Sequence, residues 1–164
     1  LVNRTVICYG SGLVEGSSSL NMVNEARIIV ANNGSSSTAF HVSIAGGIQA
    51  DLGGDPLRRS AIEVENGALL TVRNNLDLEV GAELINDGRI ELGSGTQLTL
   101  LGGGRSSGEI VGVSGTMTEL VHSYVAGSNR YEYQAGSLIA DLRIKIMDGS
   151  DVTFAGELDL GSAD

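Results

Sequence analysis

The chain has 164 residues, and its 41% of apolar residues is enough to build a packed core. Its 24 glycines and single proline suit many tight, regular corners, and they exclude a disordered linker, which would be richer in proline and charge. The net charge of −10 argues against nucleic acid or an anionic membrane surface as a partner, because such binding depends on Lys and Arg. No apolar run reaches the roughly 18 residues of a membrane-spanning helix, so no membrane insertion is expected.

Residues 1–61 predict an irregular β region that caps the rest of the chain. Apolar, strand-like runs end at Gly or Asn-Gly in "RTVICYG", "ARIIVANNG" and "FHVSIAGGIQADLGG". The segment Asn21–Val30 is compatible with a short helix that Asn21 or Asn24 would cap. The end of a repeat fold is often atypical, because it must cover an open strand edge.

From Ile62 onward the sequence repeats one pattern of about 14 residues, which we call the phrase. Gly67, Gly81 and Gly95 are evenly spaced, since 81 − 67 = 14 and 95 − 81 = 14, and Gly115, Gly136 and Gly149 take the same place later. A small residue follows each of the first three glycines, and an apolar–polar–apolar triplet precedes each of them: Ile62-Glu63-Val64, Leu76-Asp77-Leu78 and Ile90-Glu91-Leu92. A fixed period of this kind is typical of a repeat architecture.

Alternation with period 2 predicts strands, and the phrase therefore reads strand, corner, strand. A two-residue hairpin at Val80-Gly81 would place Leu78 opposite Glu83 on one face, which strand register does not tolerate. We therefore predict an all-β parallel β-solenoid, in which the corner bends the chain and each arm pairs with the next repeat. Identical places are then expected to stack as ladders: Leu70, Leu84 and Leu98. Hairpins with odd-length loops are the alternative, and the pattern leaves open whether one phrase forms a whole coil or half of one.

The expected organisation is one continuous domain, with residues 1–61 as the irregular part and residues 62–164 as the regular solenoid. Two loops, Gly102–Glu109 and Val121–Arg130, interrupt the count and are expected to be insertions.

The stretch "VRNNLDLEVGAELINDGRIELGSGTQLTL" resembles the passenger repeats of bacterial autotransporter and filamentous-haemagglutinin-type adhesins. Those repeats follow L-x-V-x-x-G-A-x-L-x-N-x-G-x-I, and the matching residues here are Leu76, Leu78, Gly81, Ala82, Leu84, Asn86, Gly88 and Ile90. The resemblance is good over Ile62–Leu120. It implies a right-handed β-helix that is exported and displayed at the cell surface or outside the cell. Because such passengers are commonly far longer, we expect a segment of a longer exported protein.

Outward carboxylates are the main candidates for chemistry. Glu63, Asp77 and Glu91 hold the same place in three phrases, and stacked carboxylates could attract Ca²⁺ or supply the acid pair of a glycosidase. The simpler interpretation is a solvated face relieved by the nearby Arg73 and Arg89. His41 and His122 are interpreted as strand residues and the lone Cys8 as a small buried hydrophobe, so no catalytic residue, metal or cofactor is expected.

The resulting hypothesis is a non-enzymatic, surface-displayed binding or structural module. Its partners would be a host-surface protein or glycan, or a second copy by self-association. Recognition is expected from the two loops and from Asp51–Arg59, because loops on a rigid scaffold usually carry binding. The candidate binding residues are Arg105, Tyr124, Asn129 and Arg130.

Tyr131 and Tyr133 fall on apolar places of the repeat and are expected in the core. Two alternatives remain for the function. One is an architectural element of a phage fibre or envelope assembly, and the other is a carbohydrate-active β-helix enzyme.

Overall fold

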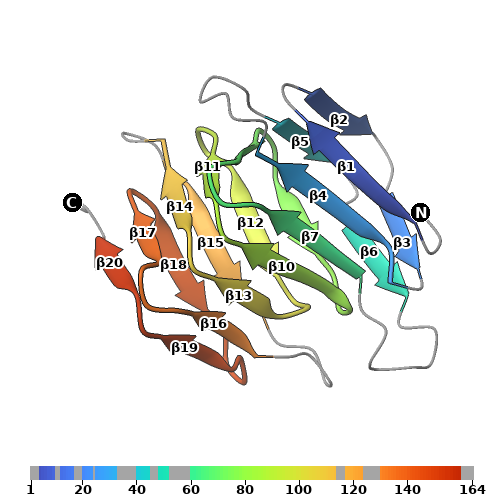
Figure 1. Cartoon of the computed structure of the whole chain (residues 1–164). Coiled ribbons are helices and arrows are strands. Elements are labelled where there is room, and N and C mark those ends of the chain that lie inside the picture. Colours follow the sequence, from blue (N-terminus) through green and yellow to red (C-terminus); the bar gives the residue numbers. More distant parts are fainter. Residues whose placement is uncertain are drawn as a thin grey trace.

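The structure is a computed structural model that describes residues 4–9, 12–16, 20–23, 25–32, 40–44, 48–51, 60–113, 117–123 and 130–159. These residues form strands and turns, in keeping with the predicted all-β class (Figure 1). None of them belongs to a helix of the length and apolarity that crossing a membrane requires.

Three sheets run side by side along the molecule, and all strand pairs in them are parallel (Figure 1). The first sheet contains β1 (Thr5–Tyr9), β4 (Arg27–Ala31), β7 (Ser60–Val64), β10 (Ala82–Asn86), β13 (Gly104–Ser106), β16 (Tyr131–Tyr133) and β19 (Val152–Phe154). The second contains β2 (Gly12–Gly16), β5 (Phe40–Ile44), β8 (Leu69–Val72), β11 (Arg89–Leu92), β14 (Glu109–Gly112), β17 (Leu138–Ala140) and β20 (Glu157–Asp159). The third contains β3 (Leu20–Val23), β6 (Ile48–Asp51), β9 (Leu76–Leu78), β12 (Gln97–Leu100), β15 (Glu119–His122) and β18 (Arg143–Ile146).

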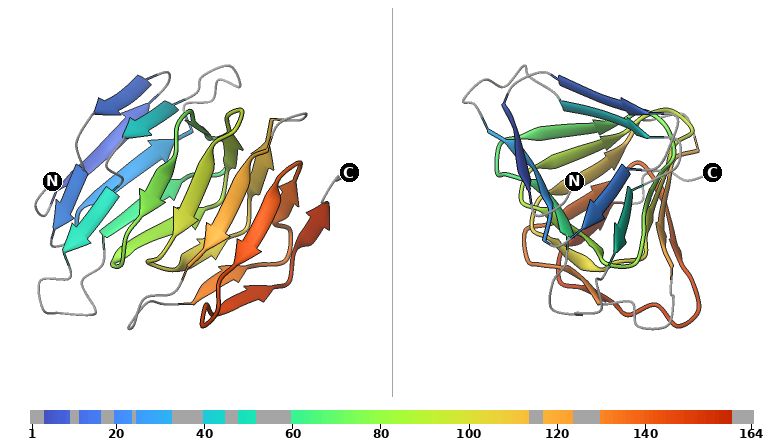
Figure 2. Two further views of the ribbon diagram at one scale, coloured as in Figure 1. Left: turned by 180° about the vertical axis from the view of Figure 1, so that it is seen from behind. Right: turned by 90° about the vertical axis from the view of Figure 1, so that its right-hand side faces the viewer.

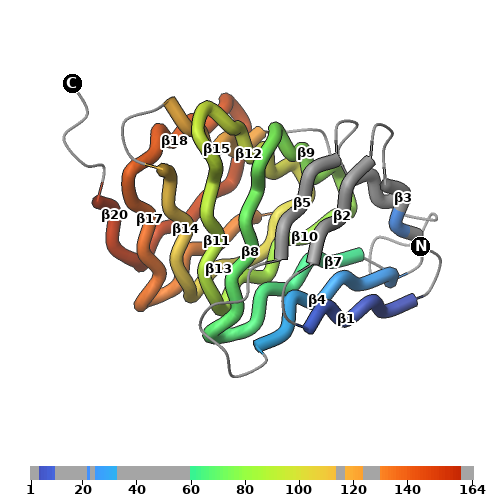
Figure 3. Tube along the Cα trace, turned by 90° about the horizontal axis from the view of Figure 1, so that it is seen from above, coloured from blue at the N-terminus to red at the C-terminus, as the bar shows by residue number. Residues whose placement is uncertain are grey.

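The chain visits the three sheets in turn, so one coil consists of three strands, and each strand pairs with the strand three places later. Seen along the stack, the sheets form three walls around one core (Figure 2). Successive coils follow one another from the N-terminal to the C-terminal end (Figure 3). This is a parallel β-solenoid, as predicted, and the parallel pairing of all the described strands contradicts the hairpin alternative.

The repeated glycines form the corners of the solenoid. Gly67, Gly81, Gly95, Gly136 and Gly149 all have positive φ, between 68° and 94°. The residue after each glycine donates its N–H to the carbonyl three residues back, as Ala68 does to Glu65 at 2.8 Å. A glycine with positive φ in the third place of such a turn is typical of type II geometry. The corner therefore turns the chain without pairing the strand before it with the strand after it, as the sequence predicted.

The predicted ladder of identical places is wrong. Leu70 lies in β8, Leu84 in β10 and Leu98 in β12, which belong to three different sheets. The stacked partner of Leu84 is Ile62, a sequence separation of 84 − 62 = 22, and that of Ile90 is Leu70, a separation of 90 − 70 = 20. One phrase covers two strands, whereas one coil consists of three strands, one in each sheet. The same position in the next phrase therefore lies in a different sheet.

The possible helix in Asn21–Val30 is also corrected by the structure. The strands β1 to β6 stack in the same three sheets as the later strands, and the segment proposed as a helix contains β3 and β4. The N-terminal coils differ mainly in longer connections. Arg27 pairs with Ala61, a separation of 61 − 27 = 34, and Gly12 pairs with Phe40, a separation of 40 − 12 = 28.

The segment Gly102–Glu109 is not an insertion. Its residues Gly104–Ser106 form β13, which pairs with β10 on one side and β16 on the other. The alternation of apolar and polar residues that identifies a strand is absent there, because two of the three residues are Gly and Ser. Gly104 has its own packing reason, since a Cβ at this position would lie 2.0 Å from the Leu84 carbonyl oxygen.

The core consists of the inward rows of the three walls, as the period-2 pattern predicted. On β10 the burial alternates along Ala82–Asn86, with Leu84 buried and Glu83 and Ile85 half-buried on the outer face. Tyr131 and Tyr133 are buried, which confirms their predicted place in the core.

A buried amide joins two coils inside this core. Asn86 is fully buried, and its amide nitrogen donates to the Ser106 hydroxyl at 3.0 Å and to the Glu109 carbonyl at 3.1 Å. This side chain satisfies backbone and side-chain groups of the next coil, and so fixes the register of two coils.

Candidate functional site

A local lengthening of the coil marks the candidate site. Along the first sheet the stacked partners Gly104 and Tyr131 have a sequence separation of 131 − 104 = 27, against 104 − 84 = 20 for the coil before and 152 − 131 = 21 for the coil after. Along the second sheet the separation of Glu109 and Leu138 is 138 − 109 = 29, against 109 − 89 = 20 for the coil before. Most of the additional residues lie between β15 and β16, within the predicted insertion Val121–Arg130, and the rest lie in the neighbouring connections. We call the corner between Ser123 and Arg130 the insertion corner.

Arg105 lies on the outer face of β13. Its guanidinium donates two hydrogen bonds to the Asp87 carboxylate, at 2.6 and 3.0 Å, and the Ser107 hydroxyl donates to the same carboxylate at 2.6 Å. The hydrogen bond from Arg105 holds the pKa of Asp87 below its usual value, so the carboxylate stays ionised. Two parallel hydrogen bonds of this kind fix the orientation of the guanidinium.

Arg130 follows the insertion corner on the neighbouring coil. Its Nε donates to the Thr153 hydroxyl at 2.7 Å and lies 3.7 Å from the Asp151 carboxylate. Its backbone carbonyl accepts a hydrogen bond from Gly104 N–H at 3.2 Å, so Arg130, which directly precedes β16, lies on the coil next to that of Arg105 in β13. The structure thus brings together two of the four predicted binding residues. The other two, Tyr124 and Asn129, and residues 52–59 of the third predicted contact segment lie outside the described residues.

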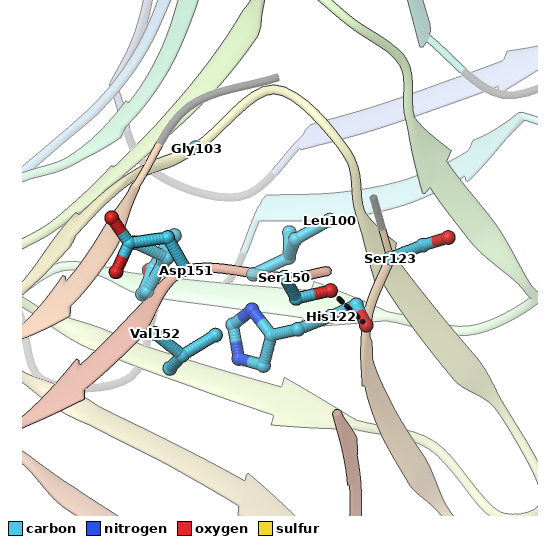
Figure 4. Close-up of a pocket in the computed structure, with 8 residues that line it drawn as sticks. Leu100, Gly103, His122, Ser123, Ser150, Asp151 and Val152 are labelled. Carbon is cyan, nitrogen blue, oxygen red and sulfur yellow. Dashed lines mark hydrogen bonds between the residues drawn. The ribbon is translucent and has the colours of Figure 1, made fainter. Parts of the chain in front are cut away.

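A small pocket of about 10 Å³ lies at the same corner, and a volume of this size accommodates about one water molecule. Figure 4 shows Asp151 and Val152 on one side of it and Ser123 and His122 on the other, with the Ser150 hydroxyl donating to the His122 carbonyl at 3.1 Å. The remaining lining residues are Leu100, Gly103 and Tyr131. The pocket is too small to enclose an organic ligand, so recognition at this corner would use the surface.

A cluster of four rings adjoins the pocket, and three of them are buried whereas Phe154 is partly buried. His122 Nε2 and the Tyr133 hydroxyl are 2.8 Å apart and share a hydrogen bond. The Tyr131 ring lies 4.9 Å from that of Tyr133, and the Phe154 ring stacks on Tyr133 at 4.7 Å. Burial lowers the pKa of His122 to about 4, so the imidazole is neutral near pH 7. His122 is thus a core strand residue, as the sequence analysis expected.

The expected acidic ladder does not form. Glu63 lies in β7, Asp77 in β9 and Glu91 in β11, one on each wall of the solenoid. Glu63 forms an ion pair with Arg27, and Glu91 accepts from Arg89 at 3.0 Å. Among the described residues, no group of three or more His, Cys, Asp or Glu side chains is arranged to hold a metal ion. The three carboxylates therefore form neither a line of charge for Ca²⁺ nor a catalytic pair with one another.

Asp87 and Ser107, which position Arg105, were not predicted from the sequence. The residues around them do recur in the sequence, but at a separation of one coil and not at the 14-residue separation of the repeated phrase. The pairs Asp87 and Ser107, Asn86 and Ser106, and Gly88 and Gly108 share one separation, 107 − 87 = 20. Comparing the sequence with itself at that offset places "NDGRI" over "SSGEI" and shows this corner.

Comparison with known proteins adds no relative to this picture. No family model, no curated protein and no solved structure matches the chain. The likeness to adhesin passengers consequently stays at the level of the repeat pattern. The structural class is nevertheless defined: the chain is a parallel β-solenoid with three strands in each coil.

Proposed function

We propose that this chain is a non-enzymatic binding and structural module of a longer, exported, adhesin-type surface protein. Its solenoid acts as a stiff support, and the insertion corner makes the contact with a host-surface protein or glycan. The proposal places the module outside the cell or on the cell surface, and it requires no cofactor.

The observation that carries this proposal is the lengthening of one coil within the more regular part of the solenoid, from β7 onward. Stacked partners of the first sheet are separated by 131 − 104 = 27 across the insertion, against 104 − 84 = 20 and 152 − 131 = 21 on either side of it. A solenoid in which each coil contacts only its neighbours tolerates such an insertion without changing its packing. Additional residues on a rigid scaffold are the usual place for recognition.

The charge around the corner supports a contact surface. Arg105 in β13 and Arg130, the residue before β16, lie on neighbouring coils of a chain whose net charge is −10. Arg130 is the more exposed of the two, with 59% of its side chain accessible against 40% for Arg105. Glu132 stacks beside Arg105 on the outer face, so the corner presents both signs of charge. Such a surface fits a polar ligand better than an apolar one.

The test replaces residues 124–129 with a two-residue Asn-Gly turn and measures binding to a glycan array and to cultured epithelial cells. We expect the wild-type chain to bind at least one of these probes, and the shortened chain to lose at least tenfold in binding at an unchanged melting temperature. Arg130→Ala is expected to weaken the same binding. Its matched control is Arg143→Ala, which removes a comparably exposed arginine from the third sheet.

Two outcomes would contradict the proposal. One is equal binding by the wild-type and shortened chains, which would place recognition elsewhere on the solenoid. The other is release of cleavage products from the glycans by the wild-type chain, which would favour a carbohydrate-active enzyme.

A further inference from the structure

The interior of the solenoid changes its composition at one level. Apart from Asn86, the inward side chains of β8 to β12 are aliphatic: Leu70, Val72, Leu76, Leu78, Ala82, Leu84, Ile90, Leu92, Leu98 and Leu100. On β15, β16 and β19 the corresponding inward positions hold rings, those of His122, Tyr131, Tyr133 and Phe154. We call these four rings, with the three strands that carry them, the aromatic layer.

The contact between β13 and β16 depends on the two tyrosines of this layer. The stacked partner of Tyr131 is Gly104, and that of Tyr133 is Ser106, so β13 contributes no large apolar side chain to the contact. The two strands pair over three residues, against five for β7 and β10. The Tyr131 hydroxyl is buried and has no hydrogen-bond partner among the described residues. Regions with few apolar contacts and few backbone hydrogen bonds are those that open locally.

His122 connects the strands on both sides of it. Its side chain is buried, and its Nε2 shares a hydrogen bond of 2.8 Å with the Tyr133 hydroxyl on the following strand. Its backbone carbonyl accepts hydrogen bonds from Met147 N–H at 2.8 Å and from the Ser150 hydroxyl at 3.1 Å. A change in the charge of His122 therefore acts on β15, on β16 and on the end of β18.

A positive charge on His122 has no compensating group inside the layer. Its ring packs against those of Tyr131 and Tyr133, and no Asp, Glu, Lys or Arg side chain is buried in the part of the chain that the structure describes. The charged side chains of the neighbouring strands lie on the outer faces: Arg105, Glu119, Glu132, Arg143 and Lys145. Asp151 lines the adjacent pocket, but its side chain is 68% exposed and pairs with Arg130. Burial of an unpaired charge strongly disfavours the closed layer.

We propose that the aromatic layer is an acid-sensitive joint of the solenoid, in which protonation of His122 separates β16 and β19 from β15 while β8 to β12 stay folded. The pocket of about 10 Å³ at His122 accommodates about one water molecule, so hydration of the imidazolium begins there. Because each coil of a solenoid contacts only its neighbours, the opening stays local. The proposal does not depend on the binding function of the insertion corner.

The direction of the pH effect follows from the two states of His122. Burial lowers the pKa of its imidazole to about 4 in the closed layer, whereas an exposed imidazole has a pKa near 6.5. Between these values the open form binds more protons than the closed form, so a fall in pH favours opening. The equilibrium constant for opening is expected to rise roughly 50-fold between pH 7 and pH 4.5.

Hydrogen–deuterium exchange followed by mass spectrometry measures the opening of each segment. Protection is compared at pH 7 and pH 4.5, after correction for the effect of pH on chemical exchange itself. One set of peptides covers β15, β16 and β19, and the other covers β8 to β12. We expect the protection of the first set to fall roughly 50-fold. At pH 4.5 the second set should remain roughly tenfold or more better protected than the first.

Two substitutions separate His122 from other groups that titrate in acid. The double variant His122→Phe, Tyr133→Phe removes both partners of the buried hydrogen bond and keeps a ring at each position. The protection of its aromatic layer should change by less than about threefold over the same pH range. Glu119→Gln is the matched control, because it removes a titrating group from the outer face of the same strand, and it should respond to acid as the wild type does.

Two results would overturn the proposal. Equal protection of the two sets of peptides at both pH values would mean that the chain opens as one cooperative unit. An equal fall in the wild type and in the double variant would mean that His122 is not the group that responds. If the double variant fails to fold, His122→Gln provides the same comparison, because its amide can bond to the Tyr133 hydroxyl and does not titrate.

Discussion

Leu84→Asp is expected to abolish cooperative folding, whereas Ile85→Asp leaves the chain folded. Leu84 is 1% exposed and lies in an inward row between Ile62 and Gly104. A carboxylate at this position would have no partner, and burying an unpaired charge costs several kcal/mol, a large part of the roughly 5–15 kcal/mol that stabilises a typical domain. Ile85 is the next residue on the same strand and lies on the outer face beside Glu63 and Arg105.

Circular dichroism during thermal and urea unfolding measures this difference. We expect no cooperative transition for Leu84→Asp, and for Ile85→Asp a melting temperature within a few degrees of the wild type. Since both substitutions introduce the same group on neighbouring residues, only the face of the sheet differs. Equal loss of stability in both variants would contradict the assignment of the inward and outward faces.

Acidification is expected to destabilise the chain through His122. Burial lowers the pKa of this imidazole in the folded state to about 4, from an unfolded value near 6.5. Between these two values the unfolded state binds more protons than the folded state, so the free energy of unfolding falls as the pH falls. The contribution is fully present above pH 6.5 and is lost by about pH 4. It amounts to roughly 3 kcal/mol.

The double variant His122→Phe, Tyr133→Phe isolates this effect. It removes both partners of the buried hydrogen bond and replaces them with apolar rings, a change that is often nearly neutral for stability. The carboxylates of Asp87 and Glu119, whose pKa values are lowered by Arg105 and Lys145, lose their own contributions in acid in both proteins.

Urea titrations at a series of pH values between 7 and 4 compare the two proteins. The wild type should lose roughly 3 kcal/mol more than the double variant over this range. Parallel curves would contradict the buried, neutral state of His122. An imidazole pKa near 6.5 in the folded protein, measured by nuclear magnetic resonance, would contradict it as well.

The local features of this fold could be predicted from the sequence because they depend on neighbouring residues. Alternation identified the inward side chains of strands such as β9 and β11, since side chains point to opposite faces with period 2. Gly67 and Gly81 indicated corners because their positive φ is easily adopted only by glycine. Tyr131 and Tyr133 were placed in the core by the same alternation.

The number of walls could not be predicted in this way, because it depends on which distant strands pair. A phrase of two strands is compatible with a coil of two sides or of three. The sequence signal that decides between them is the match of Gly88 with Gly108, at a separation of 108 − 88 = 20, which fixes a close contact between corners. A Cβ on Gly108 would lie 2.0 Å from the Gly88 carbonyl oxygen.

The candidate site was found only in part for the same reason. Arg105 was selected because it lies in an apparent loop, yet that segment is a strand, and its partner Asp87 lies on the preceding coil. The partners of Arg130, Thr153 and Asp151, follow one coil later. Contacts between coils join residues that are about 20 positions apart in the sequence, such as Arg89 and Glu109. A reading based on the 14-residue period of the phrase does not pair these residues.

Cysteine cross-linking tests the three-sided coil most directly. In a Cys8→Ser background, one variant carries cysteines at Arg89 and Glu109, which are stacked partners with a separation of 109 − 89 = 20. A second carries them at Asp77 and Glu91, which hold the same place in successive phrases, 91 − 77 = 14, but lie on different walls. Stacked strands lie about 4.8 Å apart, within the Cα separation of a disulfide. After mild oxidation, mass spectrometry should find an intramolecular disulfide in the first variant and free thiols in the second. A disulfide between positions 77 and 91, with free thiols at 89 and 109, would contradict the three-walled solenoid.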